Sequence, residues 1–449
     1  MLRKRWFRWL IPGLNIKRWL ALYSLGVGLL IIGISLLFNY QWLSYIEDIV
    51  LAYSYSLTGY YNYNVLILVG AVLIGIAAVL ILLGTSKVIK TIIRAVLPDP
   101  SSKVSDIIFQ NIRLDKGPKI VVIGGGTGLS NLLRGLKAHT SNLSAIVTVA
   151  DDGGSSGRLR EDFKMIAPGD LRNCLVALAE QEGVMENLFR YRFEGNNELS
   201  GHSFGNLFIT ALAQVYAGDV EEALEAASKL LRVRGRVIPS STEFIQLSAE
   251  LIDGTIVDGE SNIPHAGKKI KRVFSSPEHP KPEGAALRAI DEADVIILGP
   301  GSLYTSIIPN LLTDKIADHV RASKANKIYI ANVMTQPGET SGYTLADHVQ
   351  AIIDHSGVGI IDTVLANDGP LPIQMVEQYS AVGSEPVAID SKRLQDMGIR
   401  TVRATLISQE KPAIHDPERL GKVLMDIIYA MKSDMEPRVL EYYLRRADH

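Results

Sequence analysis

Two long apolar stretches without a charged residue lie in the first hundred positions of this 449-residue chain, at residues 19–38 and 65–83. Each has about the ~20 residues that a helix needs to cross the hydrocarbon core of a bilayer. A cleaved signal peptide is a poor alternative for the first stretch, because the run is long and residues 39–42 (NYQW) offer no small-residue cleavage site. The other alternative is a buried helical hairpin of a soluble protein.

The charges around these stretches favour the membrane. Residues 39–64 contain no Lys or Arg, only Glu47 and Asp48, and they are rich in Tyr and Trp, as membrane–water interfaces are. Basic residues flank the pair on its outer sides: Arg3, Lys4, Arg5, Arg8, Lys17 and Arg18 before it, and Lys87, Lys90 and Arg94 after it. The positive-inside rule therefore predicts a multi-pass cell-membrane protein with both termini and the main domain on the cytoplasmic side.

After a proline-containing segment (PDPSS, residues 98–102) the pattern changes to short apolar runs that alternate with helix-like segments. This alternation predicts an α/β fold, a Rossmann-like doubly wound and mostly parallel sheet. The runs expected to be buried strands are residues 119–123, 145–149, 295–298, 327–330 and 360–365. A small inserted β element is expected at residues 244–257, where Asp253-Gly254 forms a hairpin turn.

These patterns predict four parts: a membrane anchor (1–97), a linker (98–117), a nucleotide-binding core (118–375) and a helical segment that completes the domain (376–449). The last part carries one apolar helical stripe, which is typical of core packing or an oligomer contact: Leu420, Val423, Leu424, Ile427, Ile428 and Met431. A net charge of −2 and the lack of a basic stripe argue against nucleic acid as a partner. The single cysteine, Cys174, excludes an intrachain disulfide and is expected to be a buried apolar residue.

Glycine-rich segments follow the first two predicted strands: GGGTG (Gly124, Gly125, Gly126, Thr127 and Gly128) and VADDGGSSGRLR (residues 149–160). In open α/β sheets, ligands bind outside the carboxyl ends of the strands. Glycines let successive N–H groups converge on an anion, and the following helix adds its positive end. Arg158 and Arg160 can donate to phosphate. Asp151 and Asp152 can hold a ribose hydroxyl or magnesium, unless they only pair with these arginines.

The first glycine segment does not match the common nucleotide-binding fingerprints. Counted from Gly124, the sixth position of the Rossmann pattern is Leu129 instead of glycine, and no Gly-Lys-Ser/Thr of a P-loop follows. An acid about 20 residues further on is present in Asp151, so NAD binding stays open only as a weak alternative.

Three further polar clusters are expected at the same edge of the sheet. GPGSLYTS (residues 299–306) contains Gly299, Gly301 and Tyr304, and its Ser302, Thr305 and Ser306 hydroxyls could cap a helix or donate to phosphate. PGDLRN contributes Asp170 and Asn173, and SGHSFGN contributes His202 and Asn206, each where an apolar helical stretch begins. Tyr379 could stack on a uracil or a sugar, although a packed aromatic side chain is the simpler interpretation.

Six motifs in this order resemble the CofD-like family: GGGTGLSNLLRGL, TVADDGGSSGRLR, PGDLRN, GHSFGN, GPGSLYTSIIPNLL and NVMTQPGET. The resemblance covers about residues 119–369, and the wording of the motifs is similar to the bacterial gluconeogenesis-factor branch. For that branch it implies binding of UDP-sugars such as UDP-N-acetylglucosamine, and a role in cell shape and peptidoglycan synthesis. The related branch that contains 2-phospho-L-lactate transferase implies a guanosine-linked donor, magnesium and a deazaflavin acceptor.

By this resemblance, the nucleotide cleft would be lined by residues 124–128, Asp151, Asp152, Arg158, Asp170, Asn173, His202, Asn206 and residues 299–305. Two hypotheses about function stay open. One is a nucleotide-sugar-binding regulator without turnover, with cell-wall synthesis proteins or a second copy as protein partners. The other is a transferase for a phosphoryl-linked group, in which the Asp151–Asp152 pair would hold Mg2+, with Asp152 as the first candidate, and Arg158 would steady the leaving phosphate. Asp151, Asp152 and His202 are the candidate catalytic residues. No cofactor other than this Mg2+ is expected.

The charge asymmetry predicts the result of cysteine labelling in intact cells. A cysteine introduced at Tyr55 should react with an impermeant thiol reagent from outside, because residues 39–64 are expected to be external. A cysteine at Ser102 should be protected. Labelling of the Ser102 position by the same reagent would contradict the two-span topology.

Overall fold

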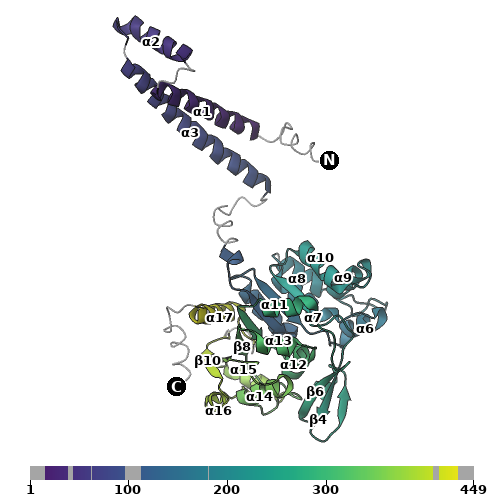
Figure 1. Ribbon diagram of the computed structural model, residues 1–449. Helices are drawn as coiled ribbons and strands as arrows, with labels where there is room; N and C mark the ends of the chain where they lie inside the picture. Colours follow the sequence, from purple (N-terminus) through teal and green to yellow (C-terminus); the bar gives the residue numbers. More distant parts are fainter. Residues whose placement is uncertain are drawn as a thin grey trace. The chain divides into compact units, whose positions relative to one another are not determined.

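The computed structural model describes residues 16–38, 44–61, 63–96, 113–180, 182–407 and 414–432 (Figure 1). The chain forms two compact units, Met1–Gln110 and Asn111–His449. The predictions on the basic residues 3–8 and on the PDPSS segment lie outside the described residues.

The described residues of the first unit form the helices α1 (Ile16–Phe38), α2 (Ser44–Thr58) and α3 (Tyr63–Val96). The segments Arg18–Leu37 and Asn64–Thr91 are long and apolar enough to cross a membrane, in agreement with the two predicted apolar helices. The segment between them holds a helix, α2, which the apolar pattern did not predict.

Glycines let α1 and α3 pack closely. A Cβ atom on Gly33 would lie 2.9 Å from the carbonyl oxygen of Gly70, and one on Gly70 would lie 2.9 Å from that of Gly33. Two turns along each helix, a Cβ on Gly26 would lie 3.2 Å from the carbonyl oxygen of Ala77. Small residues at such crossings let helix backbones approach, which is how helices associate in a lipid environment.

A seven-stranded sheet is the centre of the second unit. Its strand order is β10-β9-β8-β7-β1-β2-β3, and every pair is parallel. The strands are β1 (Ile120–Gly124), β2 (Leu143–Val147), β3 (Arg236–Pro239), β7 (Val295–Leu298), β8 (Asn326–Ile330), β9 (Thr363–Asn367) and β10 (Arg400–Ala404). The predicted doubly wound α/β fold is confirmed.

The strand order reverses between β1 and β7. From β1 the chain adds β2 and β3 on one side, while β7, β8, β9 and β10 extend the sheet on the other side. Such a switch point opens a crevice at the carboxyl ends of the two central strands, since the connections that follow them lead in opposite directions.

Helices connect the strands, and a small sheet is inserted after β3 (Figure 1). The helices are α5 (Gly126–Leu136), α6 (Gly154–Phe163), α7 (Pro168–Leu178), α8 (Glu182–Arg190), α9 (Phe204–Val215), α10 (Val220–Leu231), α11 (Gly284–Asp291), α12 (Ile308–Leu312), α13 (Ile316–Ala322), α14 (Leu345–Ser356), α15 (Ile373–Ser380), α16 (Ser391–Asp396) and α17 (Pro417–Lys432). The insertion is an antiparallel sheet of β4 (Gln246–Leu251), β5 (Ile256–Asp258) and β6 (Ile270–Ser276), as predicted except for β6.

The predicted C-terminal stripe is part of the core. Leu420, Leu424 and Ile427 are fully buried, and α17 packs along α5. The two helices touch through Gly135 and Gly421: a Cβ on Gly421 would lie 2.7 Å from the carbonyl carbon of Gly135.

This contact predicts the effect of adding one methyl group. A Cβ on Gly135 would lie 2.0 Å from the carbonyl oxygen of Pro417, so Gly135→Ala should lower the free energy of unfolding by about 1–3 kcal/mol, as overpacking does. In the control, Gly183→Ala, the new Cβ has no heavy atom within 4 Å, so stability should stay level or rise. Equal denaturation midpoints for Gly135→Ala and the wild type would contradict the close packing of α5 and α17.

Candidate functional site

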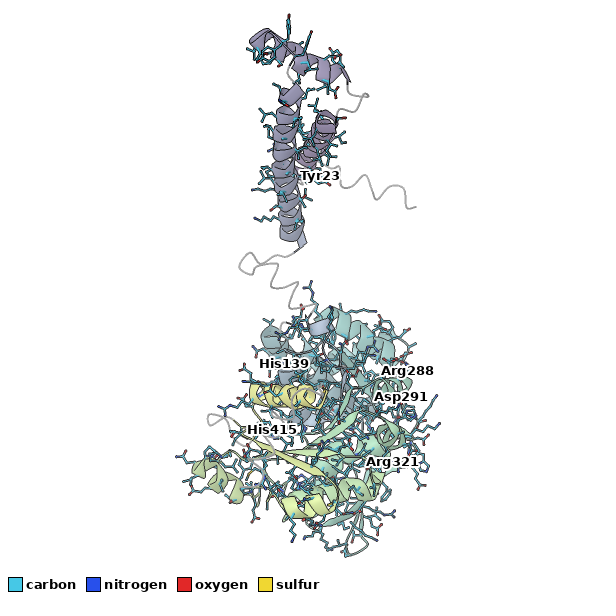
Figure 2. All side chains as sticks on the ribbon, turned by 60° about the vertical axis from the view of Figure 1, so that its left-hand side comes forward. Tyr23, His139, Arg288, Asp291, Arg321 and His415 are labelled. Carbon is cyan, nitrogen blue, oxygen red and sulfur yellow. The ribbon has the colours of Figure 1, made fainter. Side chains whose placement is uncertain are left out.

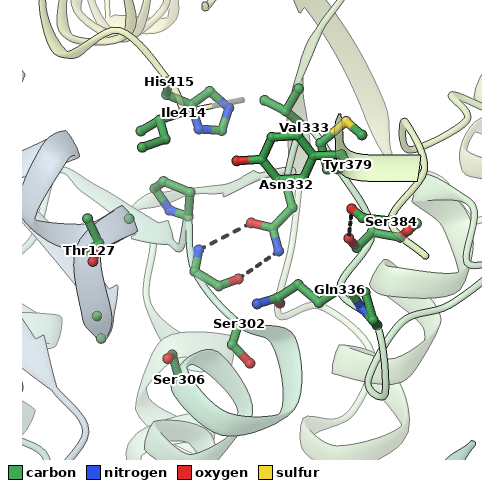
Figure 3. Close-up of a pocket in the computed structure, with 18 of the residues that line it drawn as sticks. Thr127, Ser302, Ser306, Asn332, Val333, Gln336, Tyr379, Ser384, Ile414 and His415 are labelled. Atoms are coloured by element: carbon green, nitrogen blue, oxygen red, sulfur yellow. Dashed lines mark hydrogen bonds between the residues drawn. The ribbon is translucent and has the colours of Figure 1, made fainter. Parts of the chain in front are cut away.

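Two glycine turns meet at the switch point. A Cβ on Gly128 would lie 2.6 Å from the carbonyl oxygen of Pro300, so the turn after β1 rests directly on the backbone of the turn after β7. Asn332, two residues beyond β8, holds the second turn: its Nδ2 donates to the Gly301 carbonyl at 2.8 Å, and the Gly301 amide donates back to its Oδ1 at 3.3 Å (Figure 3). Any side chain at Gly128 would push the turns apart.

A helix begins at each turn. Gly125 is the N-cap of α5. Ser302 is the N-cap of the helical segment that starts at Leu303, since its Oγ accepts the Thr305 amide at 3.2 Å. The Ser302 hydroxyl donates to the buried carboxylate of Glu339, whose pKa is raised by burial. The positive ends of two helices therefore converge on the crevice, as in sites that bind phosphate.

A cavity of about 460 Å3 opens beside the two turns (Figure 3), which is within the usual range for ligand pockets. One wall is polar and consists largely of backbone, with the hydroxyls of Ser302 and Ser306. The opposite wall is apolar. The polar wall comprises Gly125, Gly126, Thr127, Gly128, Gly301, Ser302, Ser306 and Asn332, and the apolar wall comprises Val333, Met334, Tyr379, Val382 and Ile414.

Two buried polar atoms of the cavity wall have no hydrogen-bond partner among the described residues, the Nε2 of His415 and the Oε1 of Gln336. His415 lies two residues before the start of α17 (Figure 2), and burial lowers its pKa to about 4, so the ring is neutral at physiological pH. Unpaired buried polar groups are costly, and a ligand with matching polar atoms would satisfy them.

Four carboxyl groups lie next to this cavity, on the far side of the first turn, and we call them the acid cluster: Asp151, Asp152, Asp170 and Glu260. Asp170 accepts a hydrogen bond from the Gly126 amide, and its Oδ2 would lie 2.6 Å from a Cβ on Gly125. The Oδ1 of Asp152 accepts the Ser261 amide at 2.9 Å, which attaches the loop after β5 to this cluster. The same loop brings Glu260 into hydrogen-bond contact with Thr305.

Burial and mutual repulsion change the proton affinity of this acid cluster. Burial, followed by the charge of Asp151, raises the pKa of Asp170 to about 6 and the pKa of Glu260 to about 8. Glu260 is therefore largely protonated at neutral pH. Asp170 is mostly charged, and its carboxylate partly neutralises the positive N-terminal end of α5.

The predicted residues of the SGHSFGN and ADDGGSSGRLR motifs meet beside α6. Nδ1 of His202 lies 3.0 Å from the Ser155 hydroxyl, and the Asn206 amide donates to the same oxygen at 3.1 Å. Burial, followed by the Arg158 charge, lowers the pKa of His202. The exposed Arg158 donates to the Ser200 carbonyl at 2.9 Å.

Two predicted phosphate or ligand contacts lie away from the cavity. Arg160 is buried, donates to the carbonyls of Ala150 and Ile245, and lies over the Phe244 ring. Tyr304 is buried with its hydroxyl 2.9 Å from that of Tyr343. Among the described residues, no ion pair joins Asp151 or Asp152 to the two arginines of this segment, which donate to backbone carbonyls instead. The charges of Asp152 and Asp151 still act on Arg160, whose pKa is lowered by burial.

The acid cluster does not form a metal site by itself. Among the described residues, no three His, Cys, Asp or Glu side chains converge closely enough to hold a metal ion. Asp151 Oδ1 already accepts the Gly153 amide at 2.9 Å, and Asp152 is occupied by Ser261. The residues present therefore do not fit a preformed magnesium site.

Sequence reasoning missed Glu260, Gln336, Ile414 and His415. Asn332 could have been found, because it follows the predicted strand 327–330 at the edge where ligands bind. Glu260 and His415 carry no such signal, since each arrives from a loop far from the motifs in sequence.

The model of the family described as 2-phospho-L-lactate transferase CofD matches residues 120–407. The chain belongs to the CofD family. Within it, this CofD-family protein is 48% identical over 312 residues to the gluconeogenesis factor of Bacillus subtilis (strain 168), covering 69% of this chain and 98% of that one. A crystal structure of protein BH3568 from Bacillus halodurans has a TM-score of 0.67 and 50% identity, and covers 69% of this chain and 100% of that one.

The first unit of this CofD-family protein is covered by some of the matching relatives and not by others. A relative from Nostoc sp. (strain PCC 7120) is 45% identical over 427 residues, 94% of this chain and 92% of its own length, so that match extends into the first 110 residues. The Bacillus proteins match about the length of the second unit.

The raised pKa of Glu260 predicts a pH-dependent stability. A carboxyl whose pKa is higher in the folded state stabilises the fold below its ordinary value of 4.5, and this contribution is lost as the pH rises through about 8. Glu260→Gln should therefore be more stable than the wild type at pH 9 by about 1–3 kcal/mol and similar at pH 5, given ~1.4 kcal/mol per pKa unit and partial solvent screening. Denaturant titrations at both pH values measure this.

The exposed Glu198 provides the matched control for this experiment. Glu198→Gln should follow the wild-type pH profile. A Glu260→Gln variant that is no more stable than the wild type at pH 9 would mean that the pKa of Glu260 is not raised in the folded protein.

Proposed function

We propose that this protein is a UDP-sugar-binding regulator of cell shape and cell-wall precursor synthesis during gluconeogenic growth, with UDP-N-acetylglucosamine as its ligand. The observation that carries this proposal is the two-sided cavity at the β1/β7 switch point. An apolar wall with an aromatic ring suits a base, and converging amides suit a diphosphate. The relatives named gluconeogenesis factor support the proposed link to gluconeogenic growth.

In this proposal the base lies against Tyr379, within reach of His415 and Gln336, and the diphosphate lies on the turns at Gly125–Gly128 and Gly301–Ser302. The sugar then points toward the carboxyl groups of Asp151 and Asp170. Carboxylates are strong acceptors for the hydroxyl groups of a sugar, and a neutral His415 or Gln336 can pair with the polar edge of a uracil.

A transferase is the second candidate, and the family description is the observation that favours it. Because the protein residues do not form a magnesium site, a Mg2+ ion here would take most of its ligands from the nucleotide phosphates and waters, as magnesium often does. The regulator needs no such ion.

We further propose that the first unit anchors the protein in the cell membrane with the second unit on the cytoplasmic side. This would place a sensor of a soluble wall precursor beside the proteins that use such precursors. Cell-wall synthesis proteins and a second copy of the chain are the partners we propose, and nucleic acid is not among them.

The proposed placement of the base predicts that Tyr379→Ala weakens UDP-N-acetylglucosamine binding. Loss of a stacked aromatic costs about 1–3 kcal/mol per base, which corresponds to a decrease in affinity of about 5- to 100-fold. Isothermal titration measures it, with Tyr216→Ala as control because Tyr216 lies outside the cavity lining. Unchanged affinity in folded Tyr379→Ala would contradict the proposed placement of the base.

Substitution of Arg158 tests whether the ligand extends from the cavity as far as this side chain. If a phosphate or sugar oxygen reaches Arg158, Arg158→Ala removes a charge-assisted contact of about 1.5–3 kcal/mol and lowers affinity roughly 10- to 100-fold. Arg158→Lys should restore only part of the affinity, because an ammonium group cannot reproduce the bidentate geometry of a guanidinium.

Product analysis after incubation with Mg2+ distinguishes the two candidate functions. Intact ligand supports the regulator, and release of a nucleoside monophosphate supports the transferase.

A further inference from the structure

Helix α2 buries polar residues and exposes apolar ones, whereas a surface helix of a water-soluble protein does the opposite. Its almost fully buried residues are polar: Glu47 is 9% exposed and Ser54 is 4% exposed, and α2 packs on α3. Its exposed side carries large apolar and aromatic residues, whose exposed fractions are 77% for Tyr45, 53% for Ile49 and 68% for Tyr53. In water this arrangement would leave a wide apolar surface uncovered.

The exposed residues form one stripe. Tyr45, Ile49, Tyr53 and Leu57 follow one another at intervals of four residues, so they lie on one side of the helix, and Leu57 is 69% exposed. Side chains stand out from this helix in Figure 2. We call these four residues the α2 stripe.

The chain connections restrict where the α2 stripe can lie. Only five residues separate the end of α1 from α2, and four separate α2 from α3. If α1 and α3 cross a bilayer, α2 must lie at the membrane surface where both of them emerge, because a residue spans at most ~3.6 Å. The phenolic rings of Tyr suit this zone, since they present an apolar body and a polar tip.

We propose that α2 is an interfacial helix whose stripe of Tyr45, Ile49, Tyr53 and Leu57 inserts into the head-group and upper acyl region of the lipid bilayer. The inference rests on the proposed membrane insertion of α1 and α3. Helix α2 contains Glu47 and Asp48 and no Lys or Arg, so apolar burial and not attraction to anionic lipid holds it. Contact with neutral lipid and insensitivity to salt follow from this.

A fluorescent probe on single cysteines tests the proposal, because the natural Cys174 is fully buried. The full chain is reconstituted into phosphatidylcholine vesicles with the environment-sensitive dye NBD at Ile49→Cys. Asp48→Cys is the matched neighbour on the same helix. Val358→Cys, at a position 81% exposed in the second unit, is the aqueous control. Lipids with a nitroxide on the upper acyl chain quench probes in the bilayer, and iodide quenches probes in water.

The proposal predicts that nitroxide lipids remove most of the emission at position 49 and little at position 358, with the opposite order for iodide. Position 48 should be the more iodide-sensitive of the two neighbours. In the background Tyr45→Ser/Tyr53→Ser, a probe at Leu57→Cys should lose its nitroxide quenching. Iodide quenching without nitroxide quenching at position 49, or shielding from both by a protein partner, would overturn the inference. A chain that does not float with the vesicles would instead refute the membrane proposal itself.

Discussion

The direct backbone contact between the turns after β1 and β7 is the constraint on which the rest of the second unit depends. Because Gly128 rests on the carbonyl of Pro300, the two helix starts are held at one point and the cavity between them has a fixed polar wall. Asn332 ties this arrangement to β8, the next strand along the sheet. The parallel order of β8, β7 and β1 thus determines which side chains can reach a ligand.

Positive and negative groups lie on opposite sides of this contact, which indicates how a ligand could be oriented. Amides and helix starts face the cavity, while the carboxyl groups of Asp151, Asp170 and Glu260 are packed behind the first turn. A ligand with phosphates in front and hydroxyls behind would match both sides. Asp170 itself accepts a hydrogen bond from the Gly126 amide of this turn.

Much of this could be predicted from the sequence, because the signals were local. The strand at residues 295–298 has the predicted bounds, since it is buried on both faces and has a continuous apolar run. The edge strands β3 (RVIP) and β10 (RTVRA) escaped prediction, because exposed positions place arginines among their apolar residues. The glycine turns were identified because the motifs that contain them follow strands at the edge where ligands bind.

Most of the opposite wall of the cavity could not be predicted, because its residues come from segments far apart in the sequence. Tyr379 was considered as a stacking residue, but nothing in the sequence places α15 at the end of β8. Ile414 and His415 come from the segment before α17, and only tertiary packing brings them to the same cavity. Glu260 likewise depends on the inserted sheet, whose loop reaches Asp152 through Ser261. No spacing rule connects residues that are more than a hundred positions apart.

Hydrogen–deuterium exchange of the full chain with and without UDP-N-acetylglucosamine measures whether the ligand binds at the two glycine turns, because the amides of these turns are the groups proposed to hold the diphosphate. Binding there should slow exchange at residues 125–130, 301–307 and 332–337 and leave the inserted sheet at residues 246–258 unchanged. Protection elsewhere without protection of the two glycine turns would contradict it.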